Sequence, residues 1–473
     1  MQYEVVMGLE VHVELATRSK LFCGCSAAFG ADANENTCPA CMGMPGTIPM
    51  LNKSAVEYGI KAGLVTNSEI TPKITFDKKN YFYPDLPTGH QITQFFAPIC
   101  KNGCVEIETK AGTKKIGLHQ IHIEEDAGKL VHMPGRTLID YNRAGVPLIE
   151  IVSRPDFRDS DEVIAYIKKL SSLLIYADIS DCKMHEGSMR ADINISVREL
   201  GDEKLGTRIE LKNINSLKAI VNAIEYEKNR QIEALETGFE TLVQETRRWD
   251  EEKNMSFSMR TKEEATDYRY FPNADIPPVI IDDEWIENIR VSLPEAAHEK
   301  CARFMEQYSL SEYDSKILTE SKRLSEMFEE ITKQCGSPKE AANWLIVELM
   351  NQMKRDDKEI EDVRLEPLKV AKLIKAVLDN IINRTSAKEL FIKIYSEDVN
   401  PDEYIENNAQ LSDHELLQRL CEEAVAENPK GVEKYKSGKT KVFGSFVGSV
   451  MQKTKGKADT NIVNEILKKM LDG

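Results

Sequence analysis

Four cysteines lie close together near the start of the chain, in Cys23-Gly24-Cys25 and Cys38-Pro39-Ala40-Cys41. Two tight pairs separated by a polar loop are typical of a zinc site, and four thiolates can close tetrahedrally around one ion. A closed four-cysteine site leaves no coordination position for a substrate, so we expect structural Zn²⁺ bound by Cys23, Cys25, Cys38 and Cys41. Unliganded thiols are the alternative, and we expect Cys100 and Cys104 to be free.

Ionisable side chains alternate with apolar ones in four segments that we predict to be β-strands, at 5–15, 118–125, 190–198 and 208–212. Alternation places successive side chains on opposite faces, so each strand would have one apolar and one polar face. In the second strand His119 would share a face with Ile121 and Ile123. The residues predicted on the polar faces are Glu10, His12, Glu14, His122, Glu124, Arg190, Asp192, Asn194, Glu210 and Lys212.

These strands would form a reactive surface if they belong to one antiparallel sheet. Its polar face would then combine carboxylates and a histidine with Arg and Lys side chains. Oxygen ligands suit Mg²⁺, and the basic groups suit phosphate oxygens. A half-solvated sheet with ordinary ion pairs is the alternative, because alternation alone does not show which strands are neighbours.

Three loops interleave aromatic side chains with Arg, Lys and Asn, at 79–85, 140–147 and 267–272. Such loops can stack on bases and contact phosphates, which favours a nucleotide or an RNA end as the ligand. The alternative is an ordinary turn with aromatic side chains on the surface, which explains any single loop equally well.

Two other motifs are weaker. Gly438-Lys439-Thr440 is similar to the end of a P-loop, but the spacing from Gly431 is wrong and no strand precedes it. The segment His12-Val13-Glu14 with Cys38 and Cys41 resembles the ligand pattern of zinc deaminases, although Thr37 stands where that pattern has proline. A deaminase is therefore a minor alternative.

More than one domain must position these residues, because 473 residues exceed what a single hydrophobic core usually holds. Up to about residue 290 short strands alternate with Gly and Pro turns, whereas 294–395 has the apolar period of helices. We predict an α+β protein with an N-terminal antiparallel-sheet domain at 1–292, an all-helical domain at 293–400 and a small helical tail domain at 401–473.

Charge is distributed unevenly along the chain. The net charge of −16 argues against a protein that coats nucleic acid by bulk attraction. Residues 430–473, however, contain many more lysines than acidic residues and form a basic tail. The start of the sequence lacks a basic and apolar leader, no long apolar run follows, and ten cysteines are too dilute for a disulfide scaffold. We therefore expect a cytoplasmic protein with no membrane partner.

Longer motifs occur in a fixed order along the whole chain and closely resemble the B subunit of the tRNA-dependent amidotransferases. In the N-terminal half they are Gly8-Leu9-Glu10-Val11-His12-Val13-Glu14-Leu15, Cys38-Pro39-Ala40-Cys41-Met42-Gly43-Met44-Pro45-Gly46, Lys79-Asn80-Tyr81-Phe82-Tyr83-Pro84-Asp85, His122-Ile123-Glu124-Glu125-Asp126-Ala127-Gly128-Lys129, the segment from Asp140 to Glu150, and Gly187-Ser188-Met189-Arg190. Further along they are Gly206-Thr207-Arg208, Lys212-Asn213, Glu245-Thr246-Arg247, the segment from Met259 to Pro272, Gly448-Ser449-Val450-Met451 and Lys455-Gly456-Lys457-Ala458-Asp459.

This resemblance implies a specific reaction. The family converts misacylated Glu-tRNA(Gln), and in many bacteria Asp-tRNA(Asn), by phosphorylating the side-chain carboxylate with ATP and displacing the phosphate with ammonia. A partner amidase, the A subunit, releases the ammonia from glutamine, and the small C subunit joins the two others in a heterotrimer. The resemblance further implies that the N-terminal sheet domain is a cradle that contains the catalytic site. The tail domain would hold the tRNA, and no DNA is involved. A tRNA-binding scaffold without chemistry of its own is the alternative, favoured by the lysine-rich tail.

The resemblance also implies roles for individual residues. Arg190 and Lys212 would neutralise the charge of ATP and of the carboxylate, and Lys79 is a further catalytic candidate. Asn80 and Arg143, like Lys79, would contact the nucleotide or the tRNA terminus. The expected Mg²⁺ ligands are Glu10, His12, Glu124, Glu125, Asp192 and Glu210.

Overall fold

The computed structural model describes residues 2–261, 267–408, 414–454 and 458–472. The chain divides into two compact units, Met1–Ala296 and Ala297–Gly473, and each is described by itself. Part of the motif between Met259 and Pro272 and all of Lys455-Gly456-Lys457 lie outside the described residues. Within the described residues, no helix combines the length and the apolar character needed to cross a bilayer.

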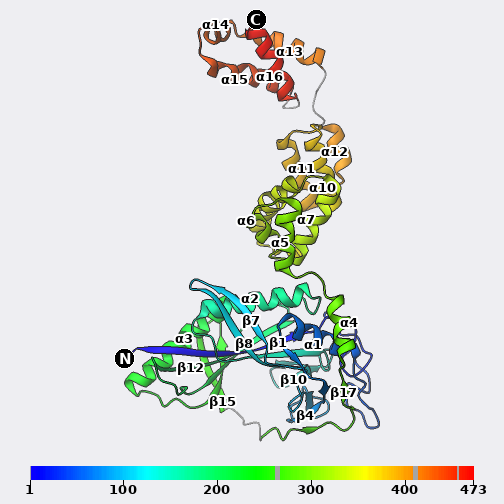
Figure 1. Cartoon of the computed structure of the whole chain (residues 1–473), viewed down its shortest axis with the longest axis vertical. Helices are drawn as coiled ribbons and strands as arrows, with labels where there is room; N and C mark the ends of the chain where they lie inside the picture. The colour runs from blue at the N-terminus through cyan, green and yellow to red at the C-terminus, as the bar shows by residue number, and fades with distance from the viewer. Residues whose placement is uncertain (1, 262–266, 409–413, 455–457, 473) are drawn as a thin grey trace. The chain divides into compact units, whose positions relative to one another are not determined.

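A ten-stranded sheet dominates the first unit and confirms the α+β prediction (Figure 1). Its strands follow the order β15-β14-β13-β12-β1-β11-β8-β6-β2, with β7 also paired to β8. In chain order they are β1 (Tyr3–Glu14), β2 (Glu69–Ile70), β6 (Cys100–Lys101), β7 (Cys104–Thr109), β8 (Gly112–Glu125), β11 (Pro147–Ser153), β12 (Met189–Glu199), β13 (Ile209–Lys212), β14 (Glu245–Asp250) and β15 (Met255–Thr261).

The sheet is mixed, which corrects the expectation of a purely antiparallel one. Strands β13 and β14 run parallel, while the other pairs in the sheet are antiparallel. The reason is the long helix α3 (Leu217–Thr237) between them, because a parallel pair needs a crossover connection rather than a hairpin. Ser216 caps the start of α3, and Gly238 ends it with a left-handed φ of 67°.

Helices cover one face of the sheet and leave the other face polar. The apolar side chains of β1, β12 and β8 pack against α1 (Lys53–Val65), α2 (Ser160–Tyr176) and α3 in one hydrophobic core. In Figure 1 α2 lies above the strands, with β4 (Asp77–Asn80) and β10 (Arg136–Asp140) below them. The alternation predicted for β1 and β12 is observed, because every second residue enters this core.

Strand β8 departs from simple alternation. Its pairing with β11 jumps from Gln120 to Leu118 between Val152 and Ser153, which marks a bulge at His119. Leu118 and Ile121 are both buried, whereas His119 is exposed. The prediction that His119 shares the face of Ile121 is therefore wrong, since the extra residue in the bulge shifts the alternation by one.

Short strands and one helix complete the first unit. Three of the strands, β4, β5 (His90–Thr93) and β16 (Phe271–Pro272), form a small sheet. The other pairs are β9 (Lys129–Met133) with β10, and β3 (Lys73–Ile74) with β17 (Val279–Ile280), followed by α4 (Asp283–Ser292).

The second unit is helical and contains two hydrophobic clusters. The first involves α5 (Ala297–Tyr308), α6 (Glu312–Leu318), α7 (Lys322–Cys335), α8 (Pro338–Asn343), the π-helix η1 (Trp344–Leu349), α9 (Met350–Asp356), the 3₁₀-helix η2 (Ile360–Asp362), α10 (Pro367–Leu378), α11 (Arg384–Glu397) and α12 (Pro401–Asn407). The second involves α13 (His414–Glu427), α14 (Pro429–Lys436), η3 (Thr440–Val442), α15 (Phe443–Lys453) and α16 (Thr460–Asp472).

Helix α12 moves the boundary that we expected at residue 400. Its side chains Tyr404 and Ile405 pack against the preceding helical core. Lys372 on α10 also holds Asp402 in an ion pair of 2.8 Å. Helix α12 therefore extends the helical domain past residue 400, and the tail cluster draws its residues from Leu417 onward.

Candidate functional site

Strand register arranges the polar face of the sheet in rows that run across the strands. Side chains that pair across neighbouring strands point to the same side. One row crosses β8, β11, β1 and β12 and consists of His122, Glu150, His12 and Arg190. The next row begins with Glu10 on β1 and Asp192 on β12. Residues that are up to about 180 positions apart in the sequence thus become neighbours on one face.

The first candidate metal group consists of His12, Glu124 and Glu150, whose ligand atoms all lie within 4.8 Å of one another. His12 Nε2 is 3.5 Å from Glu124 and 3.2 Å from Glu150. His122 approaches the same two carboxylates at 3.5 Å and 3.2 Å. Burial alone would lower the histidine pKa values, but the two carboxylates outweigh it and raise the pKa of His12 to about 9 and of His122 to about 10. The two carboxylates thus favour positive charge beside them, whether it is carried by an imidazolium or by a bound cation.

The second candidate metal group consists of Glu10, Asp192 and Glu210, again within 4.8 Å. Neighbouring side chains orient these carboxylates: Asn194 Nδ2 donates to Glu10 at 2.9 Å, and Thr246 Oγ1 donates to Glu210 at 2.8 Å. A set of three carboxylates matches the oxygen ligands that Mg²⁺ prefers.

The cations predicted from sequence lie beside these groups. Lys212 Nζ is 2.5 Å from Asp192 and 3.4 Å from Glu210. Burial lowers and these carboxylates raise the pKa of Lys212, with a net increase that keeps the amine charged. Arg190 on β12 donates to Asp126 at 2.8 Å. Both side chains are part-exposed on the open face, where a phosphate can reach them.

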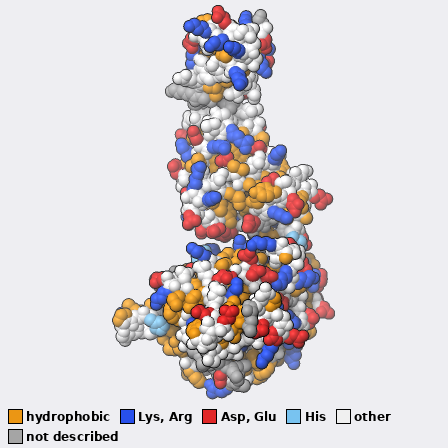
Figure 2. Space-filling view, turned by 90° about the vertical axis from the view of Figure 1, so that its left-hand side faces the viewer, with side chains coloured by type: hydrophobic (Ala, Val, Ile, Leu, Met, Phe, Trp, Pro, Cys, Tyr) orange, Lys and Arg blue, Asp and Glu red, His pale blue; other side chains and the backbone are white. Residues whose placement is uncertain are grey.

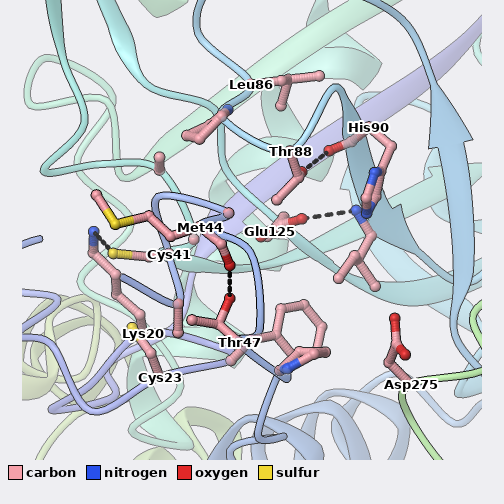
Figure 3. A pocket seen from close by; sticks show the side chains of 18 of the residues that line it. Lys20, Cys23, Cys41, Met44, Thr47, Leu86, Thr88, His90, Glu125 and Asp275 are labelled. Carbon is pink, nitrogen blue, oxygen red and sulfur yellow. Dashed lines mark hydrogen bonds between the residues drawn. The ribbon is translucent and has the colours of Figure 1, made fainter. Parts of the chain in front are cut away.

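Glu125 does not join either metal group that the described residues form. Its side chain accepts a hydrogen bond of 2.9 Å from the backbone N–H of Ile92 and lines a cavity of about 290 Å³ beside the cysteine loop (Figure 3). Adjacent strand residues point to opposite faces, which explains why Glu124 enters the metal group and Glu125 does not. Burial is the main reason that the pKa of Glu125 rises to about 7. The six expected Mg²⁺ ligands therefore separate into two groups and this outlying carboxyl.

The four cysteines predicted to bind zinc converge, with their sulfur atoms within 4.8 Å of one another. A hydrogen bond from Cys23 is the main cause that lowers the pKa of Cys41 to about 4, and Lys20 supports it with Nζ 3.7 Å from Cys41 Sγ (Figure 3). Four converging cysteine sulfur atoms fit a tetrahedral Zn²⁺ site. His12 lies instead in the carboxylate group, so the deaminase ligand pattern is not assembled.

Three weaker candidates have contacts of their own. Asn80 Nδ2 donates to the backbone carbonyl of Arg269 at 2.9 Å. Arg143 donates to the carbonyl of Ala127 at 2.9 Å and lies 3.4 Å from Asp126. Lys79 Nζ lies 4.8 Å from the ring centre of Tyr268. The structure brings none of the three into a metal group, and their ligand contacts stay a prediction.

Sequence reasoning missed Glu150 and the residues that orient the carboxylates. Glu150 is the only charged residue in Pro147–Ser153, and its position between Ile149 and Ile151 would have identified it as facing away from the core. Alternation placed Asn194 on the polar face but did not indicate that it orients Glu10. Thr246 carries no such signal, because a hydroxyl on a strand is common.

Comparison with known proteins shows the family of the chain. A family model described as the GatB/GatE catalytic domain matches residues 5–287, and one described as the GatB domain matches residues 326–471. Relatives named as the B subunit of aspartyl/glutamyl-tRNA(Asn/Gln) amidotransferase are 52% identical in Agathobacter rectalis and in Lachnoclostridium phytofermentans, over 99% of both chains. A relative of the same name in Thermoanaerobacter sp. is 50% identical over 100% of both chains. The chain therefore belongs to the family of B subunits of aspartyl/glutamyl-tRNA(Asn/Gln) amidotransferase.

Proposed function

We propose that this chain amidates misacylated tRNA. It binds Glu-tRNA(Gln), Asp-tRNA(Asn) or both, activates the side-chain carboxylate of the attached amino acid with ATP, and replaces the phosphate with ammonia. It works with an amidase, the A subunit, which releases ammonia from glutamine, and with the small C subunit. The observation that carries this proposal is the open sheet face, where two carboxylate groups lie beside Lys212 and Arg190.

The donor atoms of both metal groups fit hard divalent cations. Carboxylate oxygens dominate, and His12 is the single nitrogen donor among them. Bound Mg²⁺ would supply charge neutralisation for the phosphates and for the carboxylate that must approach them. Glu10, Asp192 and Glu210 would hold one ion, and His12, Glu124 and Glu150 would hold the other.

The two cationic side chains act on the substrates themselves. In the first step a carboxylate oxygen forms a bond to the γ-phosphorus of ATP, and ADP leaves. In the second step the ammonia nitrogen attacks the activated carbonyl carbon, inorganic phosphate leaves, and a proton is released. Both steps place phosphate oxygens where Lys212 and Arg190 can donate hydrogen bonds, and such fixed donors stabilise developing charge. Asp192 and Asp126 hold the two donors in place.

The tail cluster is proposed to hold the tRNA. Figure 2 shows patches of Lys and Arg side chains on the C-terminal bundle, which contains α14 with Lys434 and Lys436 in its last turn. Such a basic surface attracts the phosphate backbone within a Debye length of ~8 to 10 Å.

All ten cysteines are free, which is consistent with a reducing cytoplasm.

The direct test is amidation by the reconstituted heterotrimer. The complex is incubated with ATP, Mg²⁺ and glutamine, in parallel with Glu-tRNA(Gln) and with Asp-tRNA(Asn). We expect ATP-dependent formation of Gln-tRNA(Gln), Asn-tRNA(Asn) or both. Formation of neither product by a complex that still hydrolyses glutamine would refute the proposal.

The same assay separates catalysis from a scaffold role. Glu10→Gln removes one charge from a metal group, so we expect lost amidation with tRNA binding retained. Glu106→Gln is the control, because Glu106 is an exposed partner of Lys115 on the outlying hairpin. If the chain is only a scaffold, complexes that carry either variant should amidate tRNA at the wild-type rate.

A further inference from the structure

The cysteine loop, residues 23–41, is bound to a distant segment, residues 139–142. Asn34 makes the central contacts: Tyr141 donates its backbone N–H to Asn34 Oδ1 at 2.7 Å, and Asn34 Nδ2 donates to the carbonyl of Ile139 at 3.0 Å. The backbone of Asn34 has a left-handed φ of 62°, which asparagine tolerates better than most residues do. The loop thus presents one side chain to backbone groups that are far away in the sequence.

A second asparagine makes the contact reciprocal. Asn142 Oδ1 accepts from the backbone N–H of Asn36 at 2.8 Å, and Asn142 Nδ2 donates to the carbonyl of Asp32 at 2.7 Å. Irregular segments lack the partners that a sheet provides, so these side chains satisfy backbone groups that would otherwise be left unpaired. Each segment therefore keeps its shape only while the other one keeps its own.

Lys20 joins this contact to the cysteines. It is 0% exposed, and its Nζ donates to the carbonyl of Tyr141 at 3.1 Å and to Cys41 Sγ at 3.7 Å (Figure 3). Lys20 has no ion pair with a carboxylate in the part of the chain that the structure describes. A buried ammonium without a counter-charge is strongly unfavourable, whereas a zinc ion bound by four thiolates carries a net negative charge that would balance it.

The segment 139–142 leads directly into residues that hold Arg190. Arg143 lies 3.4 Å from Asp126, and Gly145 donates its backbone N–H to the carbonyl of Asp126 at 2.9 Å. The side chain of Asp126 in turn accepts from Arg190 at 2.8 Å. The position of Asp126 therefore depends on this part of the chain, and the guanidinium of Arg190 on the open face depends on Asp126.

We propose that the cysteine loop, closed by a bound zinc ion, positions Arg190 by holding the segment 139–145 in place. Asn34, Asn142 and Lys20 are positioning residues, which act through Asp126 and contact no substrate themselves. The inference rests on the proposed function, in which Arg190 donates to phosphate, and it gives the loop a role at the site. The alternative is a metal that stabilises only its own loop, in which case the segment would keep its structure without zinc.

The test measures amide hydrogen exchange in the assembled heterotrimer. Removal of zinc with a chelator should accelerate exchange of the Tyr141 amide by about 10-fold or more, because its acceptor Asn34 is no longer held. Exchange at Ile149 and Ile151 in the centre of β11 should stay unchanged, because the neighbouring strands β1 and β8 hold these residues. This readout does not depend on activity.

Asn34→Gly separates the effect of the loop from the effect of its metal. Glycine adopts the left-handed φ readily, so the backbone keeps its path while the side-chain bonds to the segment are lost. We expect the variant to keep its zinc, to exchange the Tyr141 amide about 10-fold faster, and to lose about 10-fold in kcat/KM for ATP. Asn102→Gly is the matched control, because Asn102 also has a positive φ, 53°, and lies in a turn outside the site.

Lys20→Met tests the link between the segment and the metal. Methionine has a similar length but no charge, so the zinc site would lose its counter-charge and one hydrogen bond to sulfur. We expect a chelator to remove zinc about 10-fold faster than from wild type, with faster exchange at Tyr141. Glutamine hydrolysis by the partner amidase reports that each variant complex has assembled.

Three results would overturn the inference. The first is a complex without zinc, as purified or after chelation, whose Tyr141 amide exchanges as slowly as in the zinc-loaded complex. The second is faster exchange at Ile149 and Ile151 as well, which would assign the loop to global stability. The third is Asn34→Gly with a wild-type kcat/KM for ATP. A wild type without ATP-dependent amidation would instead refute the proposed function, on which the exchange measurements do not depend.

Discussion

The hydroxyl of Thr246 provides a sensitive test of how the second metal group is held. Thr246 Oγ1 donates to Glu210 at 2.8 Å, and the two residues are only 3% and 6% exposed. Thr246→Val keeps the shape of the side chain and removes only this donor. We expect the variant to fold normally, and Glu210 to lose part of its orientation toward Glu10 and Asp192.

The size of the effect follows from the charge and the burial of Glu210. A hydrogen bond to a charged group contributes about 1.5 to 3 kcal/mol, equivalent to roughly 10-fold to 150-fold in an equilibrium constant. Loss of residues that orient a metal ligand weakens metal binding by about 10-fold to 100-fold. We therefore expect Thr246→Val to weaken divalent-cation affinity by at least about 10-fold, and Thr246→Ser to bind like wild type because it keeps the hydroxyl.

Manganese binding gives a readout that is independent of activity. Free Mn²⁺ is measured by electron paramagnetic resonance during titration of the purified complex, and the Mg²⁺ dependence of amidation is measured in parallel. A Mn²⁺ isotherm for Thr246→Val that overlays wild type, with an unchanged Mg²⁺ dependence, would refute the orienting role. Equal losses in the valine and serine variants would point instead to a packing defect.

Three other changes have defined outcomes. Glu227→Ala removes the fully buried partner of two arginines and should lower the free energy of unfolding by about 3 to 5 kcal/mol in urea titrations. Glu225→Ala, at a part-exposed position on the same helix, should change it by less than about 0.5 kcal/mol. Cys38→Ser should release zinc, measured by elemental analysis, and lower the melting temperature, while Cys104→Ser keeps the metal; a zinc-free wild type would contradict this. Deletion of 409–473 removes the whole tail cluster and should weaken tRNA binding and reduce the dependence of binding on salt concentration. If filter binding is unchanged at low and at high salt, the tail does not bind tRNA.

The faces of the central strands could be predicted from the sequence because one physical cause dominates them. Helices cover a single side of β1 and β12, so alternate positions must be apolar, and Glu10, His12 and Asp192 are identified by exclusion. The cysteine cluster was equally predictable, because its ligands are nearly adjacent in sequence and few other roles suit that spacing.

Other features depend on relationships between strands, which no single segment contains. The bulge at His119 arises in the pairing of β8 with β11, and the hydrophobic pattern of β8 alone does not locate it. Glu150 gains its role only because β11 lies beside β1.

The row on the open face also determines when the site can exist during synthesis. Glu10 emerges from the ribosome long before its neighbour Asp192, and Lys212 follows later still. Pairs of strands that are this far apart in sequence form slowly, because a large loop must close, at a cost in entropy, before the contacts that stabilise the pair can form. A nascent chain that ends before β13 therefore carries Glu10 and Asp192 without Glu210 and Lys212. The register of the sheet thus makes the site depend on nearly complete synthesis of the first unit, since only a chain that includes β13 can bring these groups together.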